Sequence, residues 1–504
     1  MDETSKKSSI KNVVFAGVAL FIAFPVQFVS RYFLIKYFGI DFLGLTGVFN
    51  SIIGMINLAD LGISGAIVFS LFKPVADKDW PMVRALLSIF KRIYFAIAGV
   101  VLLLGLAVVP FLDRIVASEF SSQMVLALYL MFVVGAASSY TLAYYQTILI
   151  VTERNHIISK VNLIWTYLLL GGQIFAIVFL DSKFVYVFFV VFLGFLSNIS
   201  LRHIVRKSQP EIVSGTTSHI TQEQIKQIKA NVFGNFLLRL SGVVVTSTDS
   251  LLISAFVGLS QVGIYSNYLI LTNFFQKVIV QVLGSLTGNI GVFATKNTGV
   301  EGERLFQRLQ FFNYLVLNIA VFAIIGAINP FIGLWIGQRY TLDNWTLILI
   351  GISFYVMNYR ALGWSFTAAY GLADKMKKTA VMEMMANIIF SLTFLVVFKL
   401  GLKGVILGTI FSTLLTVAWQ NPVVIYKYAF GISVKGYFRR YLINIVGAVV
   451  GGFGMFLLGQ SIVELNDLLR FIIQVFAAVG LGTCVSLLMY RRSTIVKEIL
   501  KKRV

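Results

Sequence analysis

Four positively charged side chains lie inside segments that are otherwise apolar. They are Arg31, Arg239, Lys277 and Arg360, in the strings FPVQFVSRYFL, NFLLRLSGVVV, TNFFQKVIVQV and YVMNYRALGWS. A charge at the centre of a membrane helix costs at least about 2.5 kcal/mol, so it normally faces a water-filled cavity or a partner. This surplus of cations predicts that the chain binds a negatively charged group within the membrane.

Few acidic residues lie at comparable depth: Asp60, Asp249 and Glu383. A desolvated carboxyl group can titrate near neutral pH, so these three are candidates to couple transport to H+ or Na+. For Asp249, neutralisation of a nearby arginine is an equal alternative. For Arg360, a structural pair with Glu383 on the next span is as good an interpretation as a substrate role, and Arg31 could instead snorkel to the outer surface.

Polar residues also recur at helical spacing. Asn273, Lys277 and Gln281 follow one another at intervals of four, and Asn50 begins a similar series that continues through Gly54 and Asn57. Such spacing places these side chains on one face of a helix, as a shared cavity requires. We therefore predict that Asn50, Asn273 and Gln281 contact substrate beside the four cations. Interhelical packing is the alternative for the glycines and for Asn50 or Asn57.

The elements that carry these residues are apolar runs. The chain has 504 residues, of which 58% are hydrophobic and 12% charged, and its mean hydropathy is +0.86. A soluble domain would have about 25% charged residues. The runs are continuously apolar and reach the length of about 20 residues that a bilayer demands, which excludes strands. We predict an all-α polytopic membrane protein with about 14 transmembrane helices. The expected spans are 12–34, 42–70, 88–111, 123–151, 157–180, 184–201, 231–257, 262–294, 309–336, 342–372, 380–399, 404–427, 438–460 and 468–490.

The net charge of +21 has an uneven distribution. Most Lys and Arg fall in alternate connections and in the terminal segments. The positive-inside rule then places both termini in the cytoplasm. We assign the basic excess to topology, and we expect the lipid bilayer and no nucleic acid as a partner.

The chain contains an internal duplication. GIDFLGLTGVFN (39–50) aligns with GLSQVGIYSNYL (258–269), and TILIVTER (147–154) aligns with AAYGLADK (368–375), at nearly the same offset. Two copies of six spans have the same orientation, and a substrate path between such repeats is expected. We predict a first bundle at 1–201, a cytoplasmic linker at 202–230, a second bundle at 231–427, and two appended helices with a basic tail at 428–504.

Several chemical signatures are missing from the sequence. There is no GxxxxGK[ST] loop, no catalytic triad and no metal-binding cluster, and Cys484 is the single cysteine. The external connections are short. We therefore expect a transporter rather than an enzyme, with no cofactor and no metal.

Three stretches resemble the polysaccharide flippases of the multidrug/oligosaccharidyl-lipid/polysaccharide (MOP) exporter superfamily, in particular Wzx-type repeat-unit flippases. They are FLGLTGVFNSIIGMINLADLGISGAIVFSLFKPVADKD (42–79), TDSLLISAFVGLSQVGIYSNYLILTNFF (248–275) and SLTGNIG (285–291). The resemblance implies two six-helix bundles in a V and alternating access. It also implies an oligosaccharide on undecaprenyl pyrophosphate as cargo for capsule, exopolysaccharide or O-antigen assembly. The cavity cations would meet the pyrophosphate, and a glycan polymerase is a candidate partner.

Three other functions are alternatives to this interpretation. Fourteen spans also occur in lipid II flippases of the same superfamily, which makes lipid II an alternative cargo. A cation-drug antiporter is opposed by the cavity cations, since like charges repel. A membrane-embedded glycan-processing enzyme is opposed by the short external connections.

Overall fold

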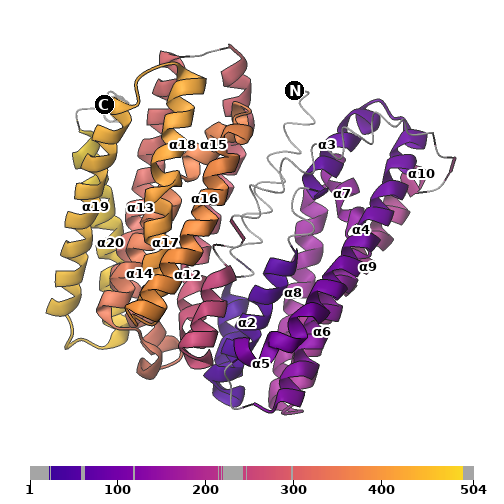
Figure 1. Cartoon of the computed structure of the whole chain (residues 1–504), viewed down its shortest axis with the longest axis horizontal. Coiled ribbons are helices and arrows are strands. Elements are labelled where there is room, and N and C mark those ends of the chain that lie inside the picture. Colours follow the sequence, from indigo (N-terminus) through magenta and orange to yellow (C-terminus); the bar gives the residue numbers. More distant parts are fainter. Residues whose placement is uncertain are drawn as a thin grey trace. The chain divides into compact units, whose positions relative to one another are not determined.

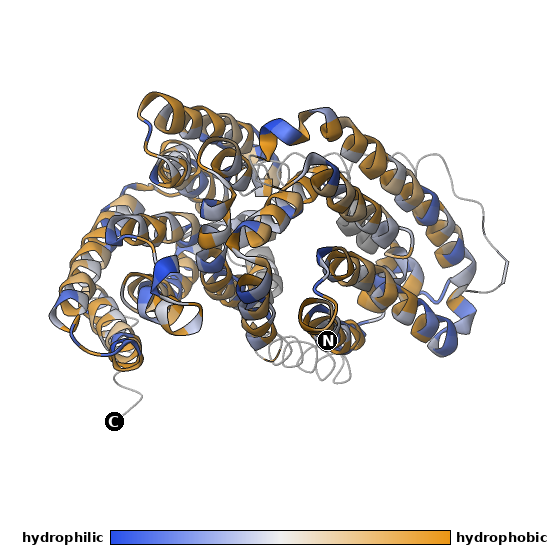
Figure 2. Cartoon of the chain, turned by 90° about the horizontal axis from the view of Figure 1, so that it is seen from below, coloured by the Kyte–Doolittle hydropathy of each residue, from blue (hydrophilic) through white to orange (hydrophobic). Residues whose placement is uncertain are grey.

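The computed structural model is predominantly helical in the residues that it describes. It describes residues 22, 24–57, 63–116, 120–213, 215, 216, 218, 242, 243, 245, 247–296 and 299–491. No strand occurs in these residues. Hydrophobic residues dominate the helices along most of their length (Figure 2).

The described residues fall into two compact units, 1–263 and 264–504. Residues 24–38 of the first unit are helical. Its further helices are α2 (Ile40–Ile56), α3 (Ile63–Ala76), α4 (Trp80–Val108), η2 (Val109–Phe111), α5 (Leu112–Ile115), α6 (Ser122–Tyr140), α7 (Tyr144–Val151), α8 (Asn155–Val178), α9 (Lys183–Ser208) and α10 (Pro210–Val213). Within this unit α4 packs against α6, and α9 packs against both α6 and α8 (Figure 1).

The second unit repeats this order of helices. It contains most of α12 (Leu259–Lys296), then α13 (Val300–Trp335), η3 (Gln338–Tyr340), α14 (Asn344–Tyr359), α15 (Ala361–Ala369), α16 (Ala373–Leu392), η4 (Thr393–Val397), α17 (Leu402–Leu415), α18 (Val417–Ile425), η5 (Tyr426–Phe430), α19 (Lys435–Ser461) and α20 (Asp467–Tyr490). The starts of α2, α4, α6, α8 and α9 each precede the starts of α12, α13, α14, α16 and α17 by about 220 residues, as expected for a duplication.

Polar residues start many of these helices where the sequence enters an apolar run. Asp79, Ser121, Ser182 and Asn466 each accept a hydrogen bond from the backbone N–H three residues ahead. Such caps satisfy amide groups that have no partner inside the helix. They fix where the helix begins.

Ten helical stretches in the described part are long and apolar enough to cross a membrane. The chain is therefore a multi-pass membrane protein, and the total of fourteen spans stays a prediction. The span expected at 42–70 is described in two parts, α2 and α3, and residues 58–62 between them lie outside the described residues. The proposed bundle boundary near residue 230 falls outside the described residues.

The two C-terminal helices are integral to the second unit. Both α19 and α20 pack against α13. Tyr314 Oη donates a hydrogen bond to the Asn444 carbonyl at 2.8 Å, and Asn318 Nδ2 donates to Ser486 Oγ at 3.0 Å. The outer face of α19, which includes Val446, Val449, Val450 and Phe453, is exposed. A membrane helix packs in this way when one side meets protein and the other meets lipid.

Candidate functional site

Arg360 lies at a break in a membrane span. Helix α14 ends at Tyr359 and α15 begins at Ala361. Arg360 is therefore both the C-cap residue of α14 and the N-cap residue of α15. Its Nε lies 3.4 Å from the Met357 carbonyl oxygen. Interrupted helices at membrane depth occur where backbone lines a cavity or is buried in protein.

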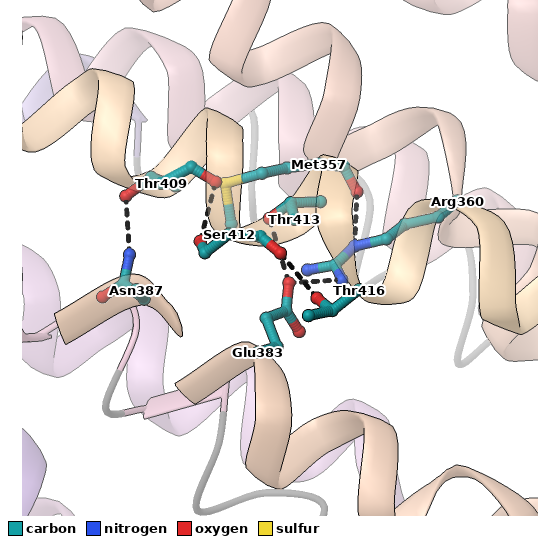
Figure 3. Close-up of polar contacts among 8 residues, drawn as sticks. All are labelled: Met357, Arg360, Glu383, Asn387, Thr409, Ser412, Thr413 and Thr416. Carbon is teal, nitrogen blue, oxygen red and sulfur yellow. Dashed lines mark hydrogen bonds and ion pairs between the residues drawn. The ribbon is translucent and has the colours of Figure 1, made fainter. Parts of the chain in front are cut away.

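The guanidinium group of Arg360 is paired with Glu383 on α16. Arg360 Nη1 lies 2.6 Å from Glu383 Oε1, and their side chains are 13% and 5% exposed. Thr413 Oγ1 of α17 donates a second hydrogen bond to the same oxygen at 2.9 Å. Figure 3 shows the three side chains converging from three helices. The buried carboxylate and the buried cation therefore neutralise each other.

Further polar contacts continue along α16 and α17 from this pair (Figure 3). Asn387 Nδ2 donates to Thr409 Oγ1 at 3.1 Å, and Ser412 Oγ donates to the Thr409 carbonyl at 3.0 Å. Thr416 Oγ1 donates to the Ser412 carbonyl at 2.6 Å. Hydroxyl and amide groups thus surround the ion pair on the side of α17.

A cavity of about 260 Å³ opens beside Arg360. Its wall combines one face of α12 with the broken span. The lining residues are Gln276, Val280 and Leu283 of α12, with Met357, Asn358, Arg360, Ala361, Trp364 and Ser365. An apolar wall with a few convergent polar groups is typical of a small-molecule site. Arg360 gives this site one positive charge.

The adjoining face of α12 has the predicted polar series. Asn273, Lys277 and Gln281 are all exposed. Gln276 precedes Lys277 in sequence, so the cavity face and the Lys277 face are neighbours on the helix surface, about 100° apart. The structure therefore brings Arg360 together with the helix that carries Lys277.

The predicted residues of the first unit are more scattered. Arg31 is half-buried and within electrostatic reach of the buried Tyr186. Asn50 is exposed on α2, with its Nδ2 donating to the Thr46 carbonyl at 2.8 Å. Asp249 is half-buried in a helical segment. Arg239 and Asp60 lie outside the described residues, so their roles stay predictions.

Three contributors to the site were not predicted. Trp364 and Gln276 line the cavity, and Thr413 supports Glu383. Trp364 and Thr413 have no charge, and threonine is common in membrane helices, so their types gave no signal. Gln276 directly precedes Lys277, and this pair of polar residues in an apolar run was a signal that could have been used. Within the described residues, no group of three or more His, Cys, Asp or Glu side chains could hold a metal ion.

The fold is shared with solved transporters of the MOP superfamily. The lipid II flippase MurJ in an inward closed conformation superimposes with a TM-score of 0.66 at 14% identity, over 95% of this chain and 99% of that one. An inward-facing multidrug resistance MATE family transporter gives 0.61 at 14% identity, over 81% and 98%. A MOP superfamily transporter from Pyrococcus furiosus, described as having a binding pocket of reverse polarity, gives 0.57 at 14% identity, over 82% and 96%.

Two comparisons made with the sequence itself find no match. No protein-family model matches the chain, and no curated protein matches it significantly. At these identities the structural likeness establishes the fold, which is that of MOP superfamily transporters.

Proposed function

We propose that the chain is a flippase that moves oligosaccharide repeat units linked to undecaprenyl pyrophosphate across the bacterial cytoplasmic membrane. The observation that carries this proposal is the cavity containing Arg360, which presents a cation inside a membrane bundle with a transporter fold. An arginine fork matches the geometry of phosphate oxygens and keeps its charge at all physiological pH values. The repeat units would serve capsule, exopolysaccharide or O-antigen assembly, with a glycan polymerase as the partner downstream.

The proposed mechanism is alternating access. Lys277 and Arg239 would attract the pyrophosphate, and Arg31 and Arg360 would hold it, while Asn50, Asn273 and Gln281 bond to sugar hydroxyls. Arg360 is already paired with Glu383. Protonation or Na+ binding at Glu383 would weaken that pair and release Arg360 toward the cavity, which gives the carboxylate a coupling role. Asp249 and Asp60 are the other proposed coupling groups.

Lipid II is the second candidate cargo. The lipid II flippase superimposes over 95% of this chain, whereas the MATE transporter superimposes over 81%. Lipid II also has a polyprenyl pyrophosphate, so the same cations would serve it. Organic cations are disfavoured as cargo because Arg360 and Lys277 would repel them. The transporter of reverse pocket polarity indicates that this fold accommodates pockets of different charge.

The test is translocation of a defined lipid in proteoliposomes. Undecaprenyl-pyrophosphate-linked N-acetylglucosamine is the probe, and lectin accessibility at the outer leaflet is the readout. In Arg360→Met/Glu383→Met the whole pair is replaced by apolar groups of similar volume, a change that buried pairs often tolerate. We expect this variant to fold but not to translocate. The matched control is Asp374→Ala/Lys377→Ala, which removes an ion pair with an exposed partner on α16.

A charge reversal separates substrate binding from structural pairing. Arg360→Glu/Glu383→Arg keeps two opposite charges together but puts a carboxylate into the cavity. If this variant or the double methionine variant translocates the probe at the wild-type rate, Arg360 does not bind the pyrophosphate. Running the assay with lipid II in parallel decides between the two cargoes.

A further inference from the structure

The first unit has a cavity of its own, of about 300 Å³, at the break between α6 and α7. At residues 141–143 the α-helical hydrogen-bond pattern is interrupted by bonds between residues three apart, while Thr141 and Ala143 keep helical backbone angles. The break lies roughly 15 Å along the helix from the turn at 152–154, at 1.5 Å per residue, and is therefore within the apolar part of the span. The polar side chains that line the cavity are Ser139, Tyr140, Gln146, Asn162, Ser197 and Asn198.

None of the side chains that line this cavity is charged. Gln146 Nε2 donates to Asn198 Oδ1 at 2.6 Å, and Asn198 Nδ2 donates to the Ser139 carbonyl at 2.8 Å. Between α9 and α8, Ser197 Oγ donates to Asn162 Oδ1 at 3.0 Å. These bonds hold the amide groups in place from four helices.

The same bonds leave hydrogen-bonding capacity toward the cavity. Within the described part of the chain, the side-chain oxygen of Gln146 and the side-chain nitrogen of Asn162 have no hydrogen-bond partner. One is an acceptor and the other is a donor. Gln146 is half-buried and Asn162 is exposed, so both groups are accessible to a ligand, and one that both donates and accepts hydrogen bonds would be favoured.

The duplication shows what is distinctive about this cavity. Tyr140, Asn162 and Ser197 precede Arg360, Glu383 and Thr416 by about 220 residues each, the offset between the helix starts of the two halves. Both cavities therefore form at the break in the fourth span of a repeat. The second unit has an arginine–glutamate pair at this place, and the first unit has a tyrosine and an asparagine.

We propose that the cavity at the α6–α7 break binds an uncharged polyhydroxylated group, namely a neutral pyranose. An inorganic cation would find no carboxylate, and an anion would find no Lys or Arg. An apolar ligand would leave the amides of Gln146 and Asn162 without partners. A sugar ring offers several hydroxyls that donate and accept, and the volume is at the lower end of the range for small-molecule sites. The inference rests on the proposed function only in naming a sugar of the cargo as the natural ligand.

The test measures binding directly. Cys484 is replaced by Ser, and Gly194→Cys introduces a thiol at the cavity wall. A Cβ atom at Gly194 would meet only Ser139 Cβ, at 3.9 Å, so the new side chain fits. Gly171→Cys is the matched control, since a Cβ atom there has no neighbour within 4 Å and the position does not line the cavity. The rate of labelling by a small methanethiosulfonate reagent is measured in purified protein.

We expect methyl glucoside and N-acetylglucosamine to slow labelling at Gly194→Cys severalfold, with no effect at Gly171→Cys. Glucuronate, which controls for charge, should protect neither position. Adding Asn162→Leu should abolish protection without changing the labelling rate in buffer. Equal rates with and without the neutral sugars would show that the cavity does not bind them, and equal protection by glucuronate would show that it does not select a neutral ligand; either result would overturn the proposal. Because transport is not measured, this result is independent of the flippase assay.

Discussion

At the scale of single residues, the Arg360–Glu383 pair is the most consequential contact of the second unit. Both side chains are largely buried, and they come from different helices. Breaking a buried pair by removing one partner typically costs about 3–5 kcal/mol because a charge is left without compensation, whereas replacing both partners can be neutral. Single and double substitutions at this pair can therefore separate its effect on stability from its effect on transport.

This gives a prediction about stability. Glu383→Ala should lower the midpoint of thermal unfolding in detergent strongly, by the equivalent of about 3–5 kcal/mol, because Arg360 stays buried without its partner. Arg360→Met/Glu383→Met should unfold much closer to the wild type. Asp374→Ala, which removes one partner of an ion pair whose carboxylate is exposed, should change little and serves as the control. A Glu383→Ala protein as stable as the double variant would mean that Arg360 reaches water.

At the scale of elements, the start of α2 packs closely against the start of α12, and a glycine lies at each of the two contacts. A Cβ atom added to Gly44 would collide with the backbone carbonyl oxygen of Leu259, and one added to Gly263 would collide with that of Ile40. The two contacts are equivalent under the offset of the duplication. Backbone atoms cannot move aside as a flexible side chain can, so these positions tolerate no larger residue.

We therefore predict that Gly44→Ala and Gly263→Ala each destabilise the protein by about 1–3 kcal/mol, the usual range for overpacking. Gly99→Ala on α4 is the control, since a Cβ atom there has no neighbour within 4 Å. In a helix interior, alanine is preferred over glycine by roughly 0.5–1 kcal/mol, so this control should be neutral or slightly stabilising. Thermal unfolding of the three variants measures the difference. Equal midpoints would contradict the close approach of the two helices.

The helices could be predicted from the sequence, but the breaks could not. Continuous apolar runs predicted the membrane spans, and the matching glycines at 39, 44, 258 and 263 indicated the repeat. The break at Arg360 has no proline or glycine directly beside it, so no residue type marks it in the sequence, and its ion pair with Glu383 joins it to another helix. The neutral cavity of the first unit was also not predicted. Its residues come from helices α6 to α9, and only folding brings them together.

Only some of the charged and polar residues predicted for the site could be placed relative to one another, again because the sequence does not show which helices meet. Arg360 and Glu383 were weighed as a pair because they lie on successive spans, and the structure joins them at 2.6 Å. Helical spacing placed Asn273, Lys277 and Gln281 on one face, and all three are exposed. The helical spacing of polar residues indicates which face of its own helix a residue occupies. It does not report which helix that face meets, so Arg31 and Asn50 could not be placed relative to the others.

At the scale of the whole molecule, the orientation in the membrane follows from charge and helix length. The connection before α19 and its first turns contain Lys427, Lys435, Arg439 and Arg440, whereas the turn at 462–466 has no basic residue. The 27 residues of α19 extend for roughly 40 Å, which exceeds a hydrocarbon core of about 30 Å. The two turns must therefore lie on opposite sides of the membrane, and the basic one is expected in the cytoplasm.

Cysteine accessibility tests this orientation. In a Cys484→Ser background, single cysteines replace Ser433 in the basic turn and Glu464 in the other turn, both of which are exposed. A membrane-impermeant maleimide applied to intact cells should label Glu464→Cys and should reach Ser433→Cys only after the membrane is permeabilised. With an even number of spans, this pattern puts both termini in the cytoplasm and lets the cavity receive cargo made there. The opposite labelling pattern would place the basic connections outside and would reverse the direction of transport that the proposed function requires.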